Sequence, residues 1–352
     1  MNSAHRYLPL LDEDLIGINE IAEMAGVSRQ AVANWRKRSE NFPRPIVELA
    51  SGPVFHRSQV RAWLRKRRVP MAQVFSTINL KGGVGKTTTT VALAEFMSGE
   101  LRKKVLVIDL DPQTNATVML IGEDRWRELN DKEWTLARLF KDALDPDNKR
   151  FNLDAALQKR VSNVKEAQTI DLLPSSLELI DVQDRLASIP SGQFYSVNPI
   201  ELLWRAVKSR LDDYDIVIVD CPPNLGIITL NGLRISHGFV VPTIPDILST
   251  YGIPQILTRI GQFSREIAEE IEPLGIIVTK YQENSTVHKN TLNRLRANGN
   301  PRVFDSIINQ ANQYAGAAEY AGQMTLKQKW GYNDLAQKLS SLSREVLSAL
   351  EV

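Results

Sequence analysis

The sequence predicts an α/β fold, in which a mostly parallel, twisted sheet is flanked by helices and preceded by a small helical domain. Two apolar runs of β-forming residues end in carboxylates, at Asp109 and at Asp220, and predict strands that are buried on both faces of a parallel sheet. Charge predicts the small domain, because residues 28–70 carry eleven Lys or Arg against two acids, whereas the chain after them is nearly balanced. We therefore expect a small domain over residues 1–68 and a large domain over residues 69–352.

The composition limits the class of protein. Its 352 residues are 43% hydrophobic and 24% charged, which is ordinary for a globular protein with two or more domains. The single cysteine, Cys221, excludes an intrachain disulfide and an iron–sulfur cluster that needs several cysteines, and a reducing cytoplasm is the natural compartment. No apolar run is long enough for a membrane-spanning helix, so we expect no membrane partner.

Residues 18–37 predict two short helices joined by a turn. Ser28 is a good N-cap for the second helix, which we expect over residues 28–38. In this helix Val32 and Trp35 pack inward. The outward positions then carry side chains of types that contact DNA bases and phosphates, namely Arg29, Gln30, Asn34 and Lys37.

Two short β runs and a third helix follow. The runs at residues 46–50 and 54–56 flank a turn at residues 51–53, and the helix is predicted at residues 58–66. The whole segment resembles a winged helix-turn-helix domain of the MerR or excisionase type, with the turn as the tip of the wing. The resemblance implies DNA binding through Ser28, Arg29, Gln30, Asn34 and Lys37. A small packing or dimerisation module is the alternative.

A glycine-rich loop, Lys-Gly-Gly-Val-Gly-Lys-Thr-Thr, lies between a predicted strand at residues 74–79 and a predicted helix at residues 87–98. In a phosphate-binding P-loop of this order, backbone N–H groups surround the phosphates, a lysine neutralises them and a hydroxyl ligates Mg²⁺. The run of four threonines favours hydroxyl groups at the start of the helix, where the helix dipole also favours phosphate. The residues expected to bind nucleotide are Lys81, Gly82, Gly83, Val84, Gly85, Lys86, Thr87 and Thr88.

The loop departs from the general P-loop pattern at its start, where Leu80 takes the position of the first glycine and Lys81 follows. The pattern Lys-Gly-Gly-x-Gly-Lys-Thr resembles the deviant Walker A motif of the ParA/MinD superfamily of ATPases. The resemblance implies ATP and Mg²⁺ as cofactors. It also implies a homodimer on ATP binding, in which Lys81 reaches across to the phosphates of the partner subunit while Lys86 neutralises those of its own.

Two further motifs follow in the order of this family. Asp109 and Asp111 come after one predicted strand, and Asp220 ends another in a segment that resembles Walker B. The resemblance implies that Asp111 lies close to the attacking water and is needed for hydrolysis, while Asp109 supports the metal region. Asp220 would hold Mg²⁺ together with Thr87, because this hard cation takes oxygen ligands. Family members usually have glycine where this chain has Thr114.

The remaining elements fit the same architecture. Lys280 follows the last predicted strand and is assigned to the adenine side of the nucleotide site, with a solvated lysine at a strand end as the alternative. Leucines at helical spacing predict a C-terminal helix at residues 333–350, which we expect to dock on the sheet. A membrane-binding helix like that of MinD would carry more basic residues. The other predicted strands and helix lie at residues 170–176, 238–242, 274–279 and 134–144.

As a whole, the resemblance implies a ParA-type DNA partition ATPase, cytoplasmic and associated with the nucleoid. Its ATP dimer would bind DNA non-specifically, and a ParB-like centromere-binding protein would stimulate hydrolysis. Longer family members also repress their own operon through such an N-terminal domain, and the resemblance extends to that role. Candidate contacts for non-specific DNA binding are the basic side chains of Lys289, Arg294, Arg296, Arg302, Lys327 and Lys329.

Two alternatives remain open on the sequence. One is a related positioning ATPase whose cargo is a protein assembly. The other is a transcription regulator that uses ATP only as a ligand that sets its shape. Steady-state phosphate release separates the second from the others, because a pure regulator shows none.

Overall fold

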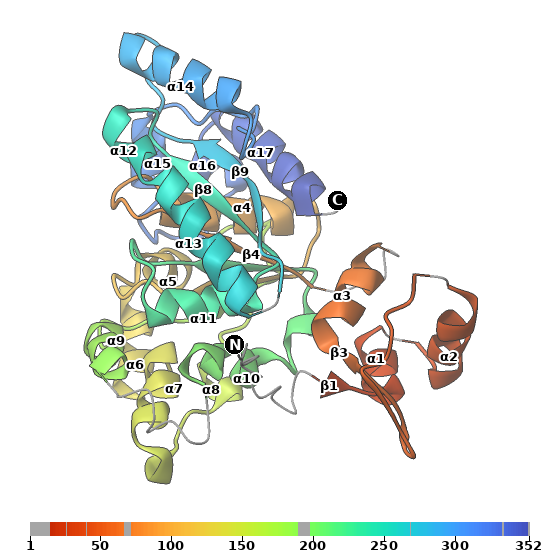
Figure 1. Cartoon of the computed structure of the whole chain (residues 1–352). Helices are drawn as coiled ribbons and strands as arrows, with labels where there is room; N and C mark the ends of the chain where they lie inside the picture. The colour runs from red at the N-terminus through yellow and green to blue at the C-terminus, as the bar shows by residue number, and fades with distance from the viewer. Residues whose placement is uncertain are drawn as a thin grey trace. The chain divides into compact units, whose positions relative to one another are not determined.

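The computed structural model describes residues 15–66, 72–188 and 198–350, apart from Gly26, Glu40, Ala268 and Asn333 (Figure 1). The chain divides into two compact units, and their described parts are residues 15–66 for the N-terminal unit and residues 72–188 and 198–350 for the large unit. The boundary predicted between residues 68 and 69 falls on residues outside the described ranges.

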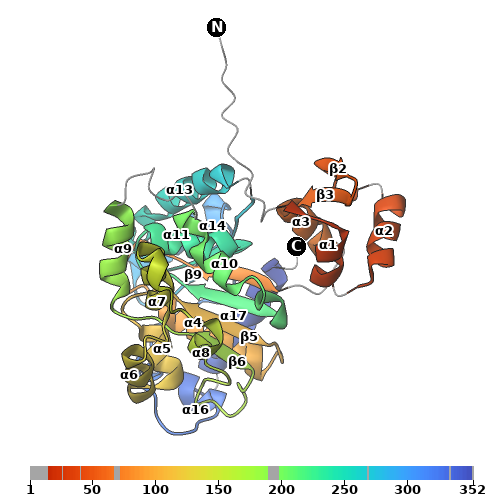
Figure 2. The ribbon, with the colours of Figure 1, turned by 90° about the horizontal axis from the view of Figure 1, so that it is seen from below.

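The described part of the N-terminal unit combines a small antiparallel sheet with three helices (Figure 2). The strands have the order β1-β3-β2, and a tight turn joins β2 to β3. The elements are β1 Leu15–Ile16, α1 Ile18–Met24, α2 Arg29–Arg38, β2 Val47–Leu49, β3 Gly52–His56 and α3 Arg57–Lys66.

Capping and aromatic packing explain how so small a unit is ordered. The Ser28 hydroxyl accepts a hydrogen bond from the Ala31 N–H at 3.2 Å and thereby starts α2, as its side chain predicts. Trp63 of α3 packs against Trp35 of α2 and against Phe42, with ring centroids 5.5 Å and 4.7 Å apart. These rings extend a buried apolar core that is formed by all three helices and β3.

The large unit contains a six-stranded sheet with the order β6-β5-β7-β4-β8-β9, and every described pair of neighbours is parallel. Helices cover it, so the predicted parallel α/β fold is confirmed for this unit (Figure 1). The strands are β4 Gln73–Thr77, β5 Val105–Asp109, β6 Ile170–Leu173, β7 Ile216–Asp220, β8 Gly238–Thr243 and β9 Glu272–Val278.

Helices lie on both faces of the sheet because both faces are apolar. Alternate strand residues point to opposite faces, so Val74 and Leu106 belong to one core cluster while Phe75 and Val107 belong to the other. The first cluster is closed mainly by α7, α9, α10, α11 and α13, and the second by α4, α5, α16 and α17. The helices are α4 Lys86–Gly99, α5 Asn115–Ile121, α6 Glu123–Asp131, α7 Leu136–Leu144, α8 Leu153–Ala156, α9 Leu179–Ser188, α10 Leu202–Val207, α11 Ile227–Ile235, α12 Ile247–Tyr251, α13 Ile253–Glu266, α14 Thr286–Asn298, α15 Asn312–Gly316, α16 Leu326–Trp330 and α17 Asp334–Leu350.

The C-terminal helix α17 packs into the core, as its leucine pattern predicts. Leu339, Leu342 and Val346 are buried in the same cluster as residues of α4 and of the sheet. Its apolar stripe is therefore occupied within the protein. Among the residues that the structure describes, no helix has the length and apolar character needed to cross a bilayer.

Candidate nucleotide-binding site

The glycine-rich loop connects the carboxyl end of β4 to the first turn of α4. Gly83 and Gly85 have φ angles of +73° and +85°, in a region where residues with a Cβ are strained. A Cβ added at Gly83 would meet no atom within 4 Å, so backbone conformation and not crowding requires glycine there. The loop thus turns into the N-terminus of a 14-residue helix, where backbone N–H groups and the helix dipole favour a phosphate.

Lys86 points its ammonium into this loop. Its Nζ donates to the carbonyl oxygen of Lys81 at 3.3 Å, and the side chain is buried. Burial lowers the pKa of Lys86, whereas the charges of Asp220 and Asp111 act in the opposite direction. The structure therefore places a buried cation inside the glycine-rich loop, and its contact with phosphate oxygens stays a prediction of the motif.

Asp220 links the end of β7 to the first turns of α4. Its two carboxylate oxygens accept hydrogen bonds from the hydroxyls of Thr87 at 2.8 Å and Thr90 at 2.9 Å. Burial raises the pKa of Asp220 to about 7, and the two threonine hydrogen bonds oppose the rise. The glycine-loop motif does not specify Thr90, whose hydroxyl helps to fix Asp220.

The pair of Thr87 and Asp220 fits a magnesium ion that is bound together with nucleotide. Hydroxyl and carboxylate oxygens are suitable ligands for Mg²⁺, which usually takes one or two carboxylates and completes its shell with phosphates and waters. Among the described residues no group of three or more His, Cys, Asp or Glu could hold a metal ion by itself. Thr87 and Asp220 supply two oxygen ligands, and phosphates and waters would complete the shell of the ion.

Asp109 and Asp111 follow β5 and adopt different roles. Asp109 is buried, and it accepts hydrogen bonds from the N–H and the hydroxyl of Thr117, at 2.9 and 2.7 Å, and from the N–H of Asp111 at 3.1 Å. Burial, assisted by the charge of Asp220, raises the pKa of Asp109 well above its ordinary value. Asp109 is thus occupied in holding the loop that carries Asp111.

The loop after Asp111 contains the departure from the family pattern at Thr114. Its φ angle is +57°, the left-handed conformation in which glycine is usually found, and it precedes the first turn of α5. The carbonyl of Asp111 accepts hydrogen bonds from the Thr114 N–H at 2.9 Å and the Ser175 hydroxyl at 2.7 Å. Two hydrogen bonds to the Asp111 carbonyl therefore hold a turn that a glycine would form without strain.

The end of β9 closes the loop from outside. Lys280 donates from Nζ to the carbonyl oxygen of Gly83 at 2.7 Å, and the Thr279 hydroxyl donates to the carbonyl of Val84, also at 2.7 Å. Lys280 thus contacts the phosphate-binding loop itself. The sequence assigns the strand end at residues 279–281 to the adenine side, and no local pattern shows that residues almost 200 positions later reach the glycine loop.

Lys81 directs its side chain away from the loop, toward the start of α12. Its Nζ donates to the Ser249 hydroxyl at 2.9 Å and lies 3.6 Å from a carboxylate oxygen of Asp246. The sequence motifs point to neither partner. Asp246 and Ser249 have the spacing of a helix N-cap and its third residue, which accounts for them locally without any functional site.

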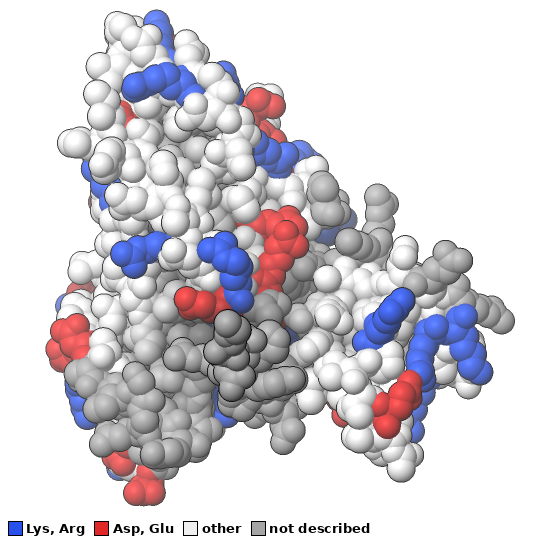
Figure 3. All heavy atoms as spheres, viewed as in Figure 1, with Lys and Arg blue, Asp and Glu red and all other residues white. Residues whose placement is uncertain are grey.

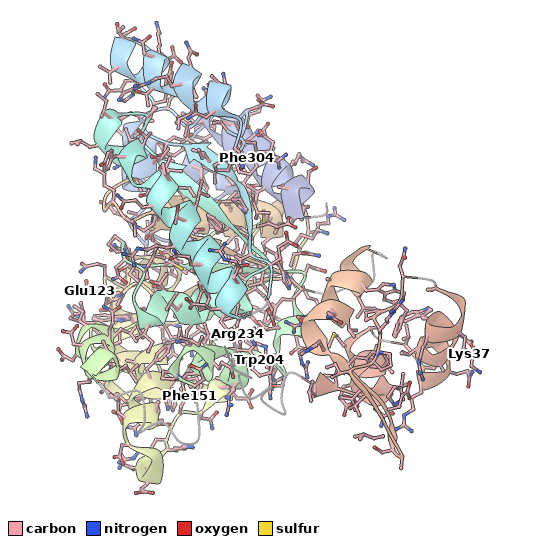
Figure 4. The ribbon with its side chains drawn as sticks, viewed as in Figure 1. Lys37, Glu123, Phe151, Trp204, Arg234 and Phe304 are labelled. Carbon is pink, nitrogen blue, oxygen red and sulfur yellow. The ribbon has the colours of Figure 1, made fainter. Side chains whose placement is uncertain are left out.

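In the N-terminal unit the predicted DNA contacts share the surface of α2. Arg29, Gln30 and Lys37 are exposed, Asn34 is half-buried, and Lys37 extends outward in Figure 4. The Gln30 amide donates to the Asn34 side-chain oxygen at 3.3 Å. Arg36, on the same helix, forms an ion pair with Glu48 of β2.

One predicted DNA contact is wrong. Lys329 is buried, and its Nζ donates to Glu95 at 2.8 Å and to Asn163 at 3.1 Å. A buried ion pair of this kind leaves no charge for a phosphate backbone. The other five candidates, Lys289, Arg294, Arg296, Arg302 and Lys327, are exposed. Figure 3 shows basic side chains over the region of α14.

Comparison with known proteins identifies the family. The model of the family described as "AAA domain" matches residues 72–273. The chain is 26% identical over 335 residues to the cell division protein PomZ of Myxococcus xanthus, covering 95% of this chain and 94% of the relative. It is 27% identical over 297 residues to the chromosome-partitioning ATPase Soj of Thermus thermophilus, covering 81% and 97% of the two chains.

A solved structure agrees with these relatives. The crystal structure of cobyrinic acid a,c-diamide synthase from Mycobacterium smegmatis with bound ADP and magnesium matches 71% of this chain and 91% of its own, with a TM-score of 0.55 and 28% identity. Its ligands agree with the ATP and Mg²⁺ predicted from the glycine loop. The chain therefore belongs to the AAA domain family, and its large unit is a P-loop ATPase domain of the ParA/MinD type.

Proposed function

We propose that this protein is an ATP-dependent DNA partition ATPase that works as a nucleotide-sandwich dimer. The observation that supports it most is the division of labour between two lysines of one loop. Lys86 is buried against the loop's own carbonyl, whereas Lys81 contacts Asp246 and Ser249 outside it. An ordinary P-loop needs only the lysine at the position of Lys86. Lys81 becomes useful when another subunit faces the site.

In this proposal, catalysis is positioning plus electrostatic stabilisation. Lys86 and the loop N–H groups bind the phosphates, and Thr87 with Asp220 hold Mg²⁺, which supplies charge neutralisation when bound. Asp111 orients the attacking water. Its carboxylate is fixed by the Gln113 N–H at 2.9 Å. Lys81 of one subunit would stabilise charge on the phosphates of the other.

The surface beside Lys81 supports association with a second copy. The short helix α12 follows Asp246, and it exposes 62% of Ile247, 76% of Leu248 and 75% of Tyr251. Large apolar side chains that are this exposed favour a protein partner over solvent. A homodimer that forms on ATP binding would cover them.

The N-terminal unit is proposed to be a winged helix-turn-helix domain. Its order of elements, the antiparallel β2–β3 hairpin and the basic character of residues 28–70 support this assignment. Helix α2 would enter the major groove with Arg29, Gln30, Asn34 and Lys37, after the N-cap Ser28. Such a domain suits recognition of an operator and repression of the protein's own operon.

Non-specific DNA binding would use exposed basic residues of the large unit. Lys289, Arg294 and Arg296 lie on α14, and each neutralised phosphate would add to the salt dependence of binding. The protein would then associate with nucleoid DNA in the cytoplasm. A ParB-like centromere-binding protein would stimulate hydrolysis and cause release.

A protein cargo is the second candidate function. The relative that covers 95% of this chain is a cell division protein, PomZ. In that case the same ATPase cycle would position a protein assembly and not a DNA copy. Normal plasmid inheritance in a deletion strain, together with recovery of a protein assembly on the tagged chain, would favour this candidate.

The proposed chemistry is tested by two variants of the large unit. We expect Lys86→Ala to abolish nucleotide binding, because it removes the buried cation of the loop. Asp111→Ala should keep ATP-dependent dimers in light scattering, while phosphate release with DNA and the partner falls by about 100-fold or more, the order of loss when a group that acts in the transition state is removed. Hydrolysis at the normal rate in Asp111→Ala would show that this carboxylate does not orient the water.

A further inference from the structure

We infer that Asp246 and Ser249 are positioning residues for Lys81, which hold its ammonium outside its own loop and ready for the nucleotide of a second copy of this chain. The inference rests on the proposed function, because it concerns the lysine that joins the two subunits. It adds two residues that the sequence motif does not contain.

The side chains of Lys81, Ser249 and Asp246 form a short chain of hydrogen bonds. Lys81 Nζ donates to the Ser249 hydroxyl at 2.9 Å, and that hydroxyl donates to an oxygen of Asp246 at 2.8 Å. The other oxygen of Asp246 lies 3.6 Å from the ammonium. The cation therefore contacts a hydroxyl oriented by a carboxylate, and the carboxylate adds its own charge.

The partners of Lys81 are anchored to the sheet. Asp246 accepts the Ser249 N–H at 2.7 Å and so caps α12, and the Ser249 carbonyl accepts the hydroxyl of Thr243, the last residue of β8, at 3.1 Å. Ser249 is buried. Burial alone would raise the pKa of Asp246, but hydrogen bonds from Ser249 and the charge of Lys81 outweigh it and lower that pKa. The Asp246 carboxylate is thus held in place and ionised at neutral pH.

The backbone of Lys81 is fixed as well, so the cap of α12 decides where the side chain goes. The Lys81 N–H donates to Asn79 at 3.0 Å, and its carbonyl accepts from Lys86. Lys86 already occupies the loop, and a second ammonium there would be repelled. Holding the long side chain outside removes part of the entropy cost of ordering it when a phosphate arrives.

The ion pair is weak enough to be replaced. The side chains of Lys81 and Asp246 are both partly exposed, and exposed pairs contribute little stability. A triphosphate carries more charge than one carboxylate and would take over the ammonium. The contact with Asp246 therefore orients the Lys81 side chain but can be broken when a triphosphate binds.

Asp246→Asn tests the inference, because asparagine caps a helix as well as aspartate but carries no charge. We expect acylation of Lys81, followed by mass spectrometry in the nucleotide-free protein, to become about threefold to fivefold faster. Dimerisation with a non-hydrolysable ATP analogue should weaken by a similar factor, the size expected for a partly exposed ion pair. ADP affinity and the melting temperature should stay unchanged. Ser249→Ala should act in the same direction.

Asp334→Asn is the matched control, since Asp334 forms an exposed ion pair with Lys338 at 2.7 Å on α17. It should alter neither Lys81 labelling nor dimerisation. Unchanged Lys81 labelling in Asp246→Asn, or tighter dimers, overturns the inference while the proposed function stands. A wild-type protein that stays monomeric with the analogue overturns both.

Discussion

At the residue scale, Asp220 shows how burial sets the chemistry of the site. It lies at the end of β7, it is fully buried, and its register in the sheet places it beside Asp109 at the end of β5. Burial raises the pKa values of both carboxylates, and the charge of Asp220 adds to the rise at Asp109. The nucleotide-free site is therefore poised to gain from a cation.

Asp220→Asn should stabilise the nucleotide-free protein at high pH. The pKa of Asp220 is about 7 in the folded state and the ordinary value is 3.8, so between these values the folded state holds a proton that the unfolded state has lost. Below pH 3.8 the Asp220 carboxyl does not reduce the free energy of unfolding, because it is protonated in both states. As pH rises from there through about 7, this stability is progressively lost. We expect urea unfolding in EDTA to give Asp220→Asn an advantage on the order of 1–3 kcal/mol at pH 8, vanishing toward pH 4.

The same variant separates stability from function. Asp220→Asn should lose binding of magnesium nucleotide although it unfolds at higher urea concentration at pH 8. A variant that is less stable than wild type at both pH values would show that the threonine hydrogen bonds outweigh the buried charge.

At the element scale, the strands could be predicted and the contacts between distant loops could not. Val105–Asp109 and Ile216–Asp220 match the apolar runs within a residue, because strands buried on both faces need such runs. The glycine loop was equally predictable, since its motif is local. Asp246 and Ser249, by contrast, reach Lys81 only through the tertiary fold.

Lys329 shows that burial, too, cannot be predicted from the local sequence. Its charge suggested a DNA contact, but its partner Glu95 lies 234 positions earlier in the chain, on α4. Glu95 also accepts the indole N–H of Trp330 at 2.6 Å, so α16 is joined to the P-loop helix by a buried polar cluster. A sequence shows that a residue is charged, whereas burial and pairing appear only once the helices are packed.

Helix α2 carries a prediction about specificity. If α2 reads an operator as proposed, replacing Arg29 and Gln30 by Ala should weaken operator binding by about tenfold or more beyond the loss on bulk DNA, because these side-chain types bond to base edges. Lys37→Ala is the comparison variant, since a phosphate contact should weaken both kinds of binding equally. Fluorescence anisotropy with operator and scrambled duplexes distinguishes the two. Equal losses in the Arg29 and Gln30 variant would reduce α2 to an electrostatic contact.

At the scale of the whole molecule, charge is divided between the two units in a way that suits two kinds of DNA binding. The basic segment of the N-terminal unit would serve operator recognition, whereas the large unit is nearly balanced and carries local basic positions such as those of α14. In the proposed function these two binding modes are controlled separately, because the nucleotide site lies in the large unit.

Lys289 and Arg296 lie two turns apart on α14, so both belong to one stripe of the helix. We expect the double Ala variant to lower ATP-dependent binding to non-operator DNA and to reduce the slope of log affinity against log salt by about 1–2 per protomer. Operator binding without ATP should not change, because the proposed function assigns it to the N-terminal unit. Arg125 and Arg127 of α6, which pair with Glu128 and Glu123, provide a control with the same loss of charge. If the control lowers the slope as much as the α14 variant does, net charge and not the α14 stripe governs binding.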